Sequence, residues 1–328
     1  FGGTCLNVGC IPSKNLLHSS FLYEQCINNL ENYGVAIEGN IKLNLKKMMA
    51  NKNTSVTKLT NGVEALLKKN NVNYKNGFAK INSSTQVEIN DEKFQTKNIL
   101  IASGSQATEL PNINIDENSI VSSTGALEFK EVPKKLAVIG GGYIGLELGS
   151  VWKRLGAEVT VIEYSNSIVP MMDKETREIF YKTLKKQGIN FLLDTKVESA
   201  NLEKLGVKLN CQNVKDKKKL EKMYDKVLVA VGRKPYTEGL GLEKLGIIKN
   251  EQGAILVDEN FQTNIKGVYA IGDVIEGPML AHKASAEGHV LAEKLSGNKP
   301  ELNYGIIPAV IYTEPEVAWV GPTEYELE

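Results

Sequence analysis

The sequence predicts an α/β protein with more than one domain, in which a doubly wound parallel sheet forms a dinucleotide-binding unit. At 328 residues the chain is longer than an ordinary single domain, and 42% hydrophobic residues can fill several cores. A glycine-rich turn at 140–145 lies between an apolar run and an amphipathic stretch, which is typical of a βαβ nucleotide-binding unit. Two closely spaced cysteines, Cys5 and Cys10, indicate a second chemical site.

Charge and hydropathy exclude several classes of partner. Lys and Arg total 39 and Asp and Glu total 39, giving a formal net charge of +0, which argues against nucleic acid or an anionic membrane surface as a partner. The sequence has no apolar run of roughly 18 residues and no secretory signal, so no membrane span is predicted. The chain begins at Phe1 and ends at Glu328 without a terminating pattern, and we expect it to be an internal fragment of a longer protein.

The N-terminal third predicts helices followed by short strands. Pro12 fits the first turn of a helix that follows the cysteines. Gly and Pro residues mark the connections between later elements. The expected elements are helices at 12–30 and 54–70, strands at 74–80, 86–89 and 98–103, and a connection at 105–133.

The central third predicts a right-handed βαβαβ unit. Continuous apolar runs read as buried parallel strands, Asp173 can cap a helix, and Gly188 can end it. A hairpin insert is expected around a turn at 212–224, with the lysine-rich run 215–219 as its solvated tip. The expected strands are 136–139, 158–162, 190–193 and 268–271, and a last helix is expected at 282–295.

The glycine-rich turn carries the nucleotide prediction. Gly140 allows the turn, Gly142 lets a pyrophosphate approach, and Gly145 lets the helix pack on the strand. The helix N-terminus then faces the phosphates. Glu163 ends the next strand, where it can accept a hydrogen bond from a ribose 2′-hydroxyl. Tyr164 follows it rather than arginine, so the sequence favours NAD over NADP.

The two cysteines leave three interpretations open from residue types alone. A loop this small gains little from a structural bridge, roughly 2 kcal/mol, and a helix N-terminus stabilises the thiolate form, so a redox-active pair is favoured. Buried, inert cysteines are the plainer alternative. A metal site would need further ligands, and no second cysteine pair or histidine cluster exists in the sequence. No metal is therefore predicted.

The segment from Gly3 to Lys14, GTCLNVGCIPSK, resembles the redox-active loop of the pyridine nucleotide–disulfide oxidoreductases. The resemblance implies that Cys5 exchanges with a substrate dithiol and that Cys10 lies against a flavin. It also implies that Lys14 lies by the flavin and pairs with Glu147, two residues past the last turn glycine. These four residues are the expected catalytic group.

Further segments resemble the nucleotide-contact signatures of the same family. They imply an FAD site besides the NAD site, with Lys14 shared between the catalytic and flavin roles. The 268–273 segment resembles the signature whose aspartate bonds the ribityl chain, and 281–284 resembles the segment alongside the flavin ring. The FAD contact residues implied are Ser103, Gly104, Gly272, Asp273, Ala281 and His282, and Gly232 ends the equivalent strand of the NAD-binding domain.

The resemblance covers nearly the whole chain and implies its domains. Residues 1–114 are expected to form an FAD-binding domain that lacks its first strand, and 115–256 an NAD-binding domain, both Rossmann-like. Residues 257–306 return to the FAD-binding part. Residues 307–328 resemble the start of an α+β dimerisation domain, cut after about one strand. That domain carries a histidine that serves the partner subunit's active site in the family.

The choices of Leu6, Ile11 and Ser13 are most similar to the dihydrolipoamide dehydrogenases of this family. The implied reaction oxidises dihydrolipoamide through the Cys5–Cys10 disulfide and FAD to NAD⁺. The implied partners are lipoyl domains of 2-oxoacid dehydrogenase or glycine cleavage complexes, and a second subunit in a homodimer. The expected location is cytoplasmic, or the mitochondrial matrix in a eukaryote, with a role in cell redox homeostasis. The alternatives are a mercuric or glutathione reductase, or a nucleotide-binding fragment without turnover.

Overall fold

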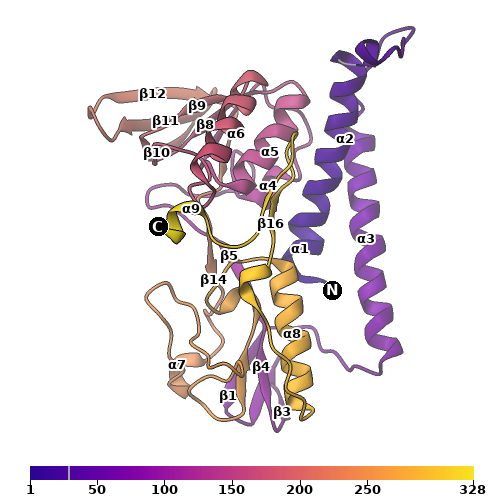
Figure 1. Ribbon diagram of the computed structural model, residues 1–328, viewed down its shortest axis with the longest axis vertical. Coiled ribbons are helices and arrows are strands. Elements are labelled where there is room, and N and C mark those ends of the chain that lie inside the picture. The colour runs from indigo at the N-terminus through magenta and orange to yellow at the C-terminus, as the bar shows by residue number, and fades with distance from the viewer. Residues whose placement is uncertain (29) are drawn as a thin grey trace. The chain divides into compact units, whose positions relative to one another are not determined.

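The computed structural model describes residues 1–28 and 30–328, which form two compact units. Each unit has its own core of buried apolar side chains. The expected mixed α/β architecture is confirmed (Figure 1). Unit 1 comprises Phe1–Val63, Ala107–Gly232 and Pro308–Glu328, and unit 2 comprises Glu64–Gln106 and Arg233–Ile307. The four segments drawn from the sequence, three assigned to nucleotide binding and one to dimerisation, remain predictions.

A parallel sheet with helical crossovers forms the centre of unit 1 (Figure 1). Its elements are β6 (Ile120–Val121), α4 (Ser123–Ala126), β7 (Lys135–Ile139), α5 (Tyr143–Arg154), β8 (Glu158–Ile162), α6 (Lys174–Lys186), β9 (Asn190–Leu192) and β13 (Lys226–Val229). The strand order is β6–β13–β7–β8–β9, and every neighbouring pair is parallel. The predicted βαβαβ unit is therefore confirmed. β6 and α4 lie in the stretch predicted as a connection, because elements this short carry no periodic signal.

The start of α6 differs from the prediction in one respect. Asp173 is the N-cap residue, but its side chain makes no capping hydrogen bond. Its Oδ1 instead accepts a hydrogen bond from the backbone N–H of Glu324 at 2.8 Å. Gly188 lies just beyond the C-terminus of α6, as predicted.

The predicted turn at 212–224 is wrong. The chain forms an antiparallel meander of β10 (Thr195–Glu203), β11 (Gly206–Asn213) and β12 (Lys219–Tyr224). Only residues 214–218 connect β11 to β12. In β12 only Tyr224 is buried. This polar edge strand was predicted as a turn because its sequence lacks the alternation of apolar and polar residues that identifies a strand. The interior of the meander holds Cys211, whose burial raises the pKa of its thiol to about 11.

Three α-helices and one 3-10 helix form the N-terminal segment, and the two helices that were predicted begin earlier than expected. α1 (Gly3–Val8) precedes α2 (Cys10–Asn28), a short 3-10 helix covers Leu30–Tyr33, and α3 spans Leu45–Lys69. The helix predicted at 12–30 is α2, and residue 29 lies outside the described residues. The helix predicted at 54–70 begins at residue 45, because Asn44 accepts a hydrogen bond from the Lys47 N–H at 2.9 Å and caps it.

The last segment of unit 1 is a hairpin followed by one helical turn. β16 (Ala309–Ile311) pairs antiparallel with β17 (Val317–Trp319), and α9 (Glu324–Leu327) follows. The expectation of a single strand is corrected to two, because the chain reverses direction over residues 312–316 between them.

Unit 2 combines an antiparallel sheet, a parallel strand pair and one long helix. Its elements are β1 (Ala79–Ser83), β2 (Gln86–Ile89), β3 (Glu92–Gln95), β4 (Ile99–Ile101), β5 (Ser105–Ala107) at its border, β14 (Arg233–Pro235), α7 (Leu242–Leu245), β15 (Val268–Ala270), η2 (Gly272–Val274), α8 (Ala281–Leu295) and η3 (Tyr304–Ile306). β15 pairs parallel with β4.

Predictions in unit 2 were accurate for apolar elements and poor for polar ones. The strand predicted at 86–89 is confirmed, and those at 98–103 and 268–271 are shorter. The strand predicted at 74–80 lies instead at 79–83, after the break at Gly77. The fully exposed β3 was missed. Within the described part of the chain, no helix has the length and apolar character needed to cross a membrane.

Candidate redox and nucleotide-binding site

The cysteine loop lies at the junction of α1 and α2. Cys5 lies within α1 and Cys10 is the first residue of α2, where unpaired backbone N–H groups favour negative charge. The two residues form a disulfide with a Cα–Cα distance of 4.6 Å. Both are partly exposed, which sets them apart from the fully buried, inert cysteines of the alternative interpretation. The bond is thus accessible to a thiol.

One turn further along α2, Lys14 forms an ion pair with Glu147 of α5. Their Nζ and Oε2 atoms are 2.7 Å apart. The Glu147 side chain is 4% exposed and that of Lys14 is 32% exposed. The other carboxylate oxygen, Oε1, accepts a hydrogen bond from the backbone N–H of Tyr312 at 2.9 Å. The Tyr312 ring lies under the Lys14 ammonium, 4.6 Å from the ring centroid, which is within cation–π range.

The glycine turn joins β7 to α5 as the sequence predicts. Gly140 has φ +108°, and a Cβ at this position would collide with the carbonyl oxygen of Ala230. A Cβ on Gly145 would meet the Gly140 carbonyl oxygen, whereas one on Gly142 would meet nothing within 4 Å. Gly142 is the N-cap of α5 and supplies no side-chain cap. The protein therefore leaves open space over the helix N-terminus, as a pyrophosphate requires.

Glu163 follows β8 and lies against this turn. Its Oε2 accepts a hydrogen bond from Gly141 N–H at 2.6 Å, and its Oε1 accepts one from Ser165 N–H at 2.7 Å. Each carboxylate oxygen has two lone pairs, so both retain capacity for a ribose hydroxyl. Gly232 lies three residues after the end of β13, and its carbonyl oxygen accepts a hydrogen bond from the Thr108 N–H at 3.0 Å.

In unit 2 the implied flavin contacts fall on two adjacent strand ends. Gly104 follows β4 and its carbonyl accepts from Tyr236 N–H at 2.9 Å, while Ser103 Oγ donates to the Tyr236 carbonyl at 2.6 Å. Gly272 and Asp273 follow β15, the parallel neighbour of β4. Asp273 Oδ2 accepts a hydrogen bond from Ser105 Oγ at 2.7 Å.

Ala281 and His282 are the first residues of α8, and both are exposed. In unit 1 the structure joins Cys5 to Cys10 by the disulfide and Lys14 to Glu147 by the ion pair.

Sequence reasoning missed residues that support the predicted ones. Arg233 donates from Nε to Ser105 Oγ at 2.7 Å and from Nη2 to the Ser105 carbonyl at 2.6 Å, which fixes the serine that holds Asp273. Tyr312 supports Glu147 in the same way. Lys283 and Glu287, buried within α8, contact Gly272. Each of these supporting residues lies close in sequence to a motif, but its residue type alone does not predict its hydrogen bond.

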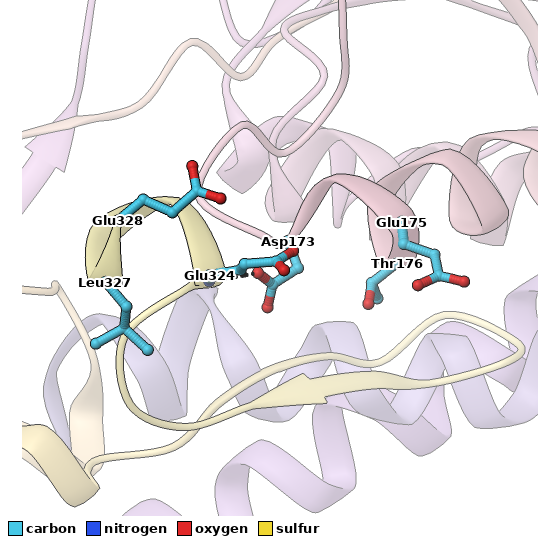
Figure 2. A pocket seen from close by; sticks show the side chains of 6 residues that line it. All are labelled: Asp173, Glu175, Thr176, Glu324, Leu327 and Glu328. Carbon is cyan, nitrogen blue, oxygen red and sulfur yellow. Dashed lines mark hydrogen bonds between the residues drawn. The ribbon is translucent and has the colours of Figure 1, made fainter.

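A surface hollow in unit 1 is lined by none of the predicted site residues. Figure 2 shows it between the start of α6 and α9, lined by Asp173, Glu175, Thr176, Glu324, Leu327 and Glu328. Four carboxylates would repel a nucleotide phosphate, so the hollow is not a nucleotide site. Among the described residues, no group of three or more His, Cys, Asp and Glu is arranged to hold a metal ion.

Comparisons with known proteins agree with this geometry. The dihydrolipoyl dehydrogenase of Dictyostelium discoideum mitochondria is 52% identical over the whole chain, which covers 68% of that protein. Arabidopsis thaliana mitochondrial dihydrolipoyl dehydrogenase 2 is 50% identical, with 65% covered. A leghemoglobin reductase of Vigna unguiculata is 49% identical, with 63% covered. The chain thus spans about two thirds of the length of these relatives.

Solved structures agree as well. The HOCl-induced flavoprotein disulfide reductase RclA of Escherichia coli superposes with a TM-score of 0.86 at 27% identity, covering 100% of this chain and 71% of that one. The family described as pyridine nucleotide-disulphide oxidoreductase matches residues 1–288. The chain belongs to the pyridine nucleotide-disulphide oxidoreductase family.

Proposed function

We propose that the protein of which this chain is a part is an NAD-dependent dihydrolipoamide dehydrogenase. The reaction converts dihydrolipoamide and NAD⁺ to lipoamide, NADH and a proton. The observation that carries the proposal is the accessible Cys5–Cys10 disulfide at the start of α2. Relatives named dihydrolipoyl dehydrogenase at 48–52% identity support this substrate over mercury or glutathione.

The residues divide the work as follows. A substrate thiolate attacks Cys5 Sγ, the Cys5–Cys10 bond breaks, and Cys10 leaves as a thiolate that the α2 N-terminus stabilises. The second substrate thiol then displaces Cys5, which releases the substrate as a disulfide. Lys14 holds a positive charge one turn further along α2, and Glu147 keeps that ammonium in place.

The cofactors of this family are FAD and NAD, and the chain fits both. FAD supplies the two-electron relay between the Cys5–Cys10 dithiol and NAD⁺. Gly140, Gly142, Gly145, Glu163 and Gly232 would hold NAD, because the turn leaves the α5 N-terminus open. In unit 2, Ser103, Gly104, Gly272, Asp273, Ala281 and His282 would hold FAD, and Arg233 and Ser105 already fix the orientation of Asp273. The family resemblance assigns a flavin role to Lys14 of unit 1 as well.

The partners and location follow from the same proposal. The substrate dithiol is carried by the lipoyl domain of a 2-oxoacid dehydrogenase or glycine cleavage complex, and the protein acts as a homodimer. The relatives named mitochondrial favour the matrix over the cytoplasm.

The full-length protein tests the function directly. Purified with one FAD per chain, it should reduce NAD⁺ with dihydrolipoamide and show a much lower kcat/KM with NADP⁺ or with glutathione. A dithiol should bleach the flavin absorbance. Equal rates with glutathione disulfide and NADPH would instead identify a glutathione reductase, and absence of bleaching would identify a module without turnover.

Glu163 sets the choice of coenzyme. Its carboxylate lies at the glycine turn and repels a 2′-phosphate while accepting from a 2′-hydroxyl. Losing one such contact costs on the order of 1–3 kcal/mol, or roughly fivefold to 150-fold in affinity. Glu163→Gln should therefore raise the Kd for NAD⁺ and narrow its advantage over NADP⁺, as measured by titration with each nucleotide. Glu175→Gln, on the neighbouring α6, is the matched control. An unchanged NAD⁺/NADP⁺ ratio would remove Glu163 from this role.

A further inference from the structure

Helix α8 contains a fully buried ion pair that no step of the proposed reaction uses. Lys283 and Glu287 lie one turn apart, with Nζ and Oε1 separated by 2.9 Å, and each side chain is 0% exposed. Placing two charges in a protein interior is costly, and replacement by apolar residues is often neutral or stabilising. The free energy of folding alone therefore does not account for this ion pair, and another role has to be found for it.

Both members of the pair contact the same peptide segment. Glu287 Oε2 accepts a hydrogen bond from the Gly272 N–H at 2.7 Å, and Lys283 Nζ donates to the Gly272 carbonyl at 3.1 Å. The donor and the acceptor of one buried glycine are thus each held by a full charge, which makes the hydrogen bonds stronger than neutral ones. Gly272 is held from both sides.

The backbone conformation of Gly272 explains why Lys283 and Glu287 have to hold this residue from both sides, an arrangement we call the clamp. The residue has φ +78°, and a Cβ there would lie 3.3 Å from Ala284 Cβ. Its left-handed backbone turns the chain two residues after the end of β15, so its orientation decides where the next side chain, Asp273, projects. Asp273 in turn meets Ser105 Oγ at 2.7 Å.

A third residue completes the clamp. Tyr304 donates its hydroxyl hydrogen to Glu287 Oε1 at 2.8 Å. Tyr304 as a whole is 45% exposed, but desolvation at its hydroxyl, together with the hydrogen bond to Glu287, raises the pKa of that hydroxyl. The hydroxyl therefore remains a donor across the physiological range, and Glu287 keeps both carboxylate oxygens occupied.

We propose that Glu287, with Lys283 and Tyr304, is a positioning group that fixes the Gly272–Asp273 turn and so aims the Asp273 carboxylate at a sugar-alcohol hydroxyl of the flavin cofactor. The inference rests on the proposed function, because it needs a flavin site at Asp273. It assigns to buried residues of α8 an effect on cofactor affinity that acts through Asp273 and not through direct contact.

The test is a double-mutant cycle on the full-length protein. FAD is stripped, and the Kd for FAD is measured by flavin fluorescence for wild type, Glu287→Gln, Asp273→Asn and the double variant. Glu287→Gln should raise the Kd by at least about tenfold, the loss expected for one charge-assisted hydrogen bond. The double variant should be little weaker than Asp273→Asn alone, because the two residues act in series. The Kd for NAD⁺ should not change.

Two further variants keep the result interpretable. Glu293→Gln, on the exposed side of the same helix, should leave FAD binding at the wild-type value. If Glu287→Gln does not fold, Tyr304→Phe removes only one hydrogen bond to Glu287. It should raise the Kd several-fold, again without adding to Asp273→Asn.

One set of results would refute the positioning role of Glu287 alone, and a different result would refute the proposed function. Additive effects on the FAD Kd, or an FAD Kd unchanged in Glu287→Gln and Tyr304→Phe, would overturn the positioning role while the wild-type enzyme still oxidises dihydrolipoamide. Full-length wild type that binds no FAD would overturn the proposed function and this inference with it.

Discussion

Cys5→Ser and Cys10→Ser are each expected to lower dihydrolipoamide oxidation by the full-length enzyme at least about a thousandfold, because residues that act as one unit fail together. Their visible spectra should differ. Cys5→Ser leaves Cys10 as a thiolate at the N-terminus of α2, which should give a permanent long-wavelength charge-transfer band with the flavin. Cys10→Ser should lack that band at every pH and in every redox state.

The control is Cys26→Ser, which changes a free, half-buried cysteine in the same helix. It should leave both the rate and the spectrum at wild-type values. Identical visible spectra for Cys5→Ser and Cys10→Ser would show that the order of the two cysteines has been assigned wrongly. Full activity in either variant would remove the disulfide from the reaction.

Lys14→Met is expected to slow flavin reduction and to lower the flavin potential, because a positive charge that favours the reduced, anionic form is lost. It also leaves the buried Glu147 carboxylate without its cation. A fully buried broken pair costs about 3–5 kcal/mol. Because the Lys14 side chain is 32% exposed, we expect about 1–3 kcal/mol of folding free energy. Stopped-flow reduction, a potential titration and urea unfolding measure the three effects.

A charge-preserving variant separates the electrostatic effect from packing. Lys14→Arg should retain most of the flavin potential even if geometry slows the reaction, since the guanidinium also pairs with a carboxylate. Lys174→Met, at the exposed start of α6, is the control. A potential that stays at the wild-type value in Lys14→Met, with only stability lost, would reduce the pair to a structural contact.

The sequence predicted the secondary structure best where residues are apolar or where a turn requires a glycine. β8 and β2 have the bounds predicted, and the βαβαβ order is confirmed, because continuous or alternating apolar residues define buried strands. The polar strands β3 and β12 were missed or taken for a turn, since edge strands that face solvent carry no such pattern. The early start of α3 depended on a single capping residue, Asn44.

For the candidate site, the motif positions predicted Lys14 and Glu147 as partners, and the structure places their charged atoms 2.7 Å apart. The supporting residues could not be predicted in this way. Arg233, Tyr312 and Glu287 act through backbone groups or through a neighbour. Such contacts depend on tertiary proximity and not on residue type, so one sequence carries no signal for them.

The hydrogen bond from Tyr312 to Glu147 has a consequence for the order of assembly during synthesis. Its two residues are 165 positions apart, whereas Lys14 lies 133 positions before Glu147. A ribosome adding roughly 5–20 residues per second needs on the order of ten seconds or more between Glu147 and Tyr312. During that interval a nascent chain can already contain the cysteines, the glycine turn and Lys14, but one oxygen of the buried carboxylate has no backbone donor. The β16–β17 hairpin therefore adds its hydrogen bond late. The Lys14–Glu147 ion pair near the disulfide has all its hydrogen bonds only after the chain has grown past its nucleotide-binding part.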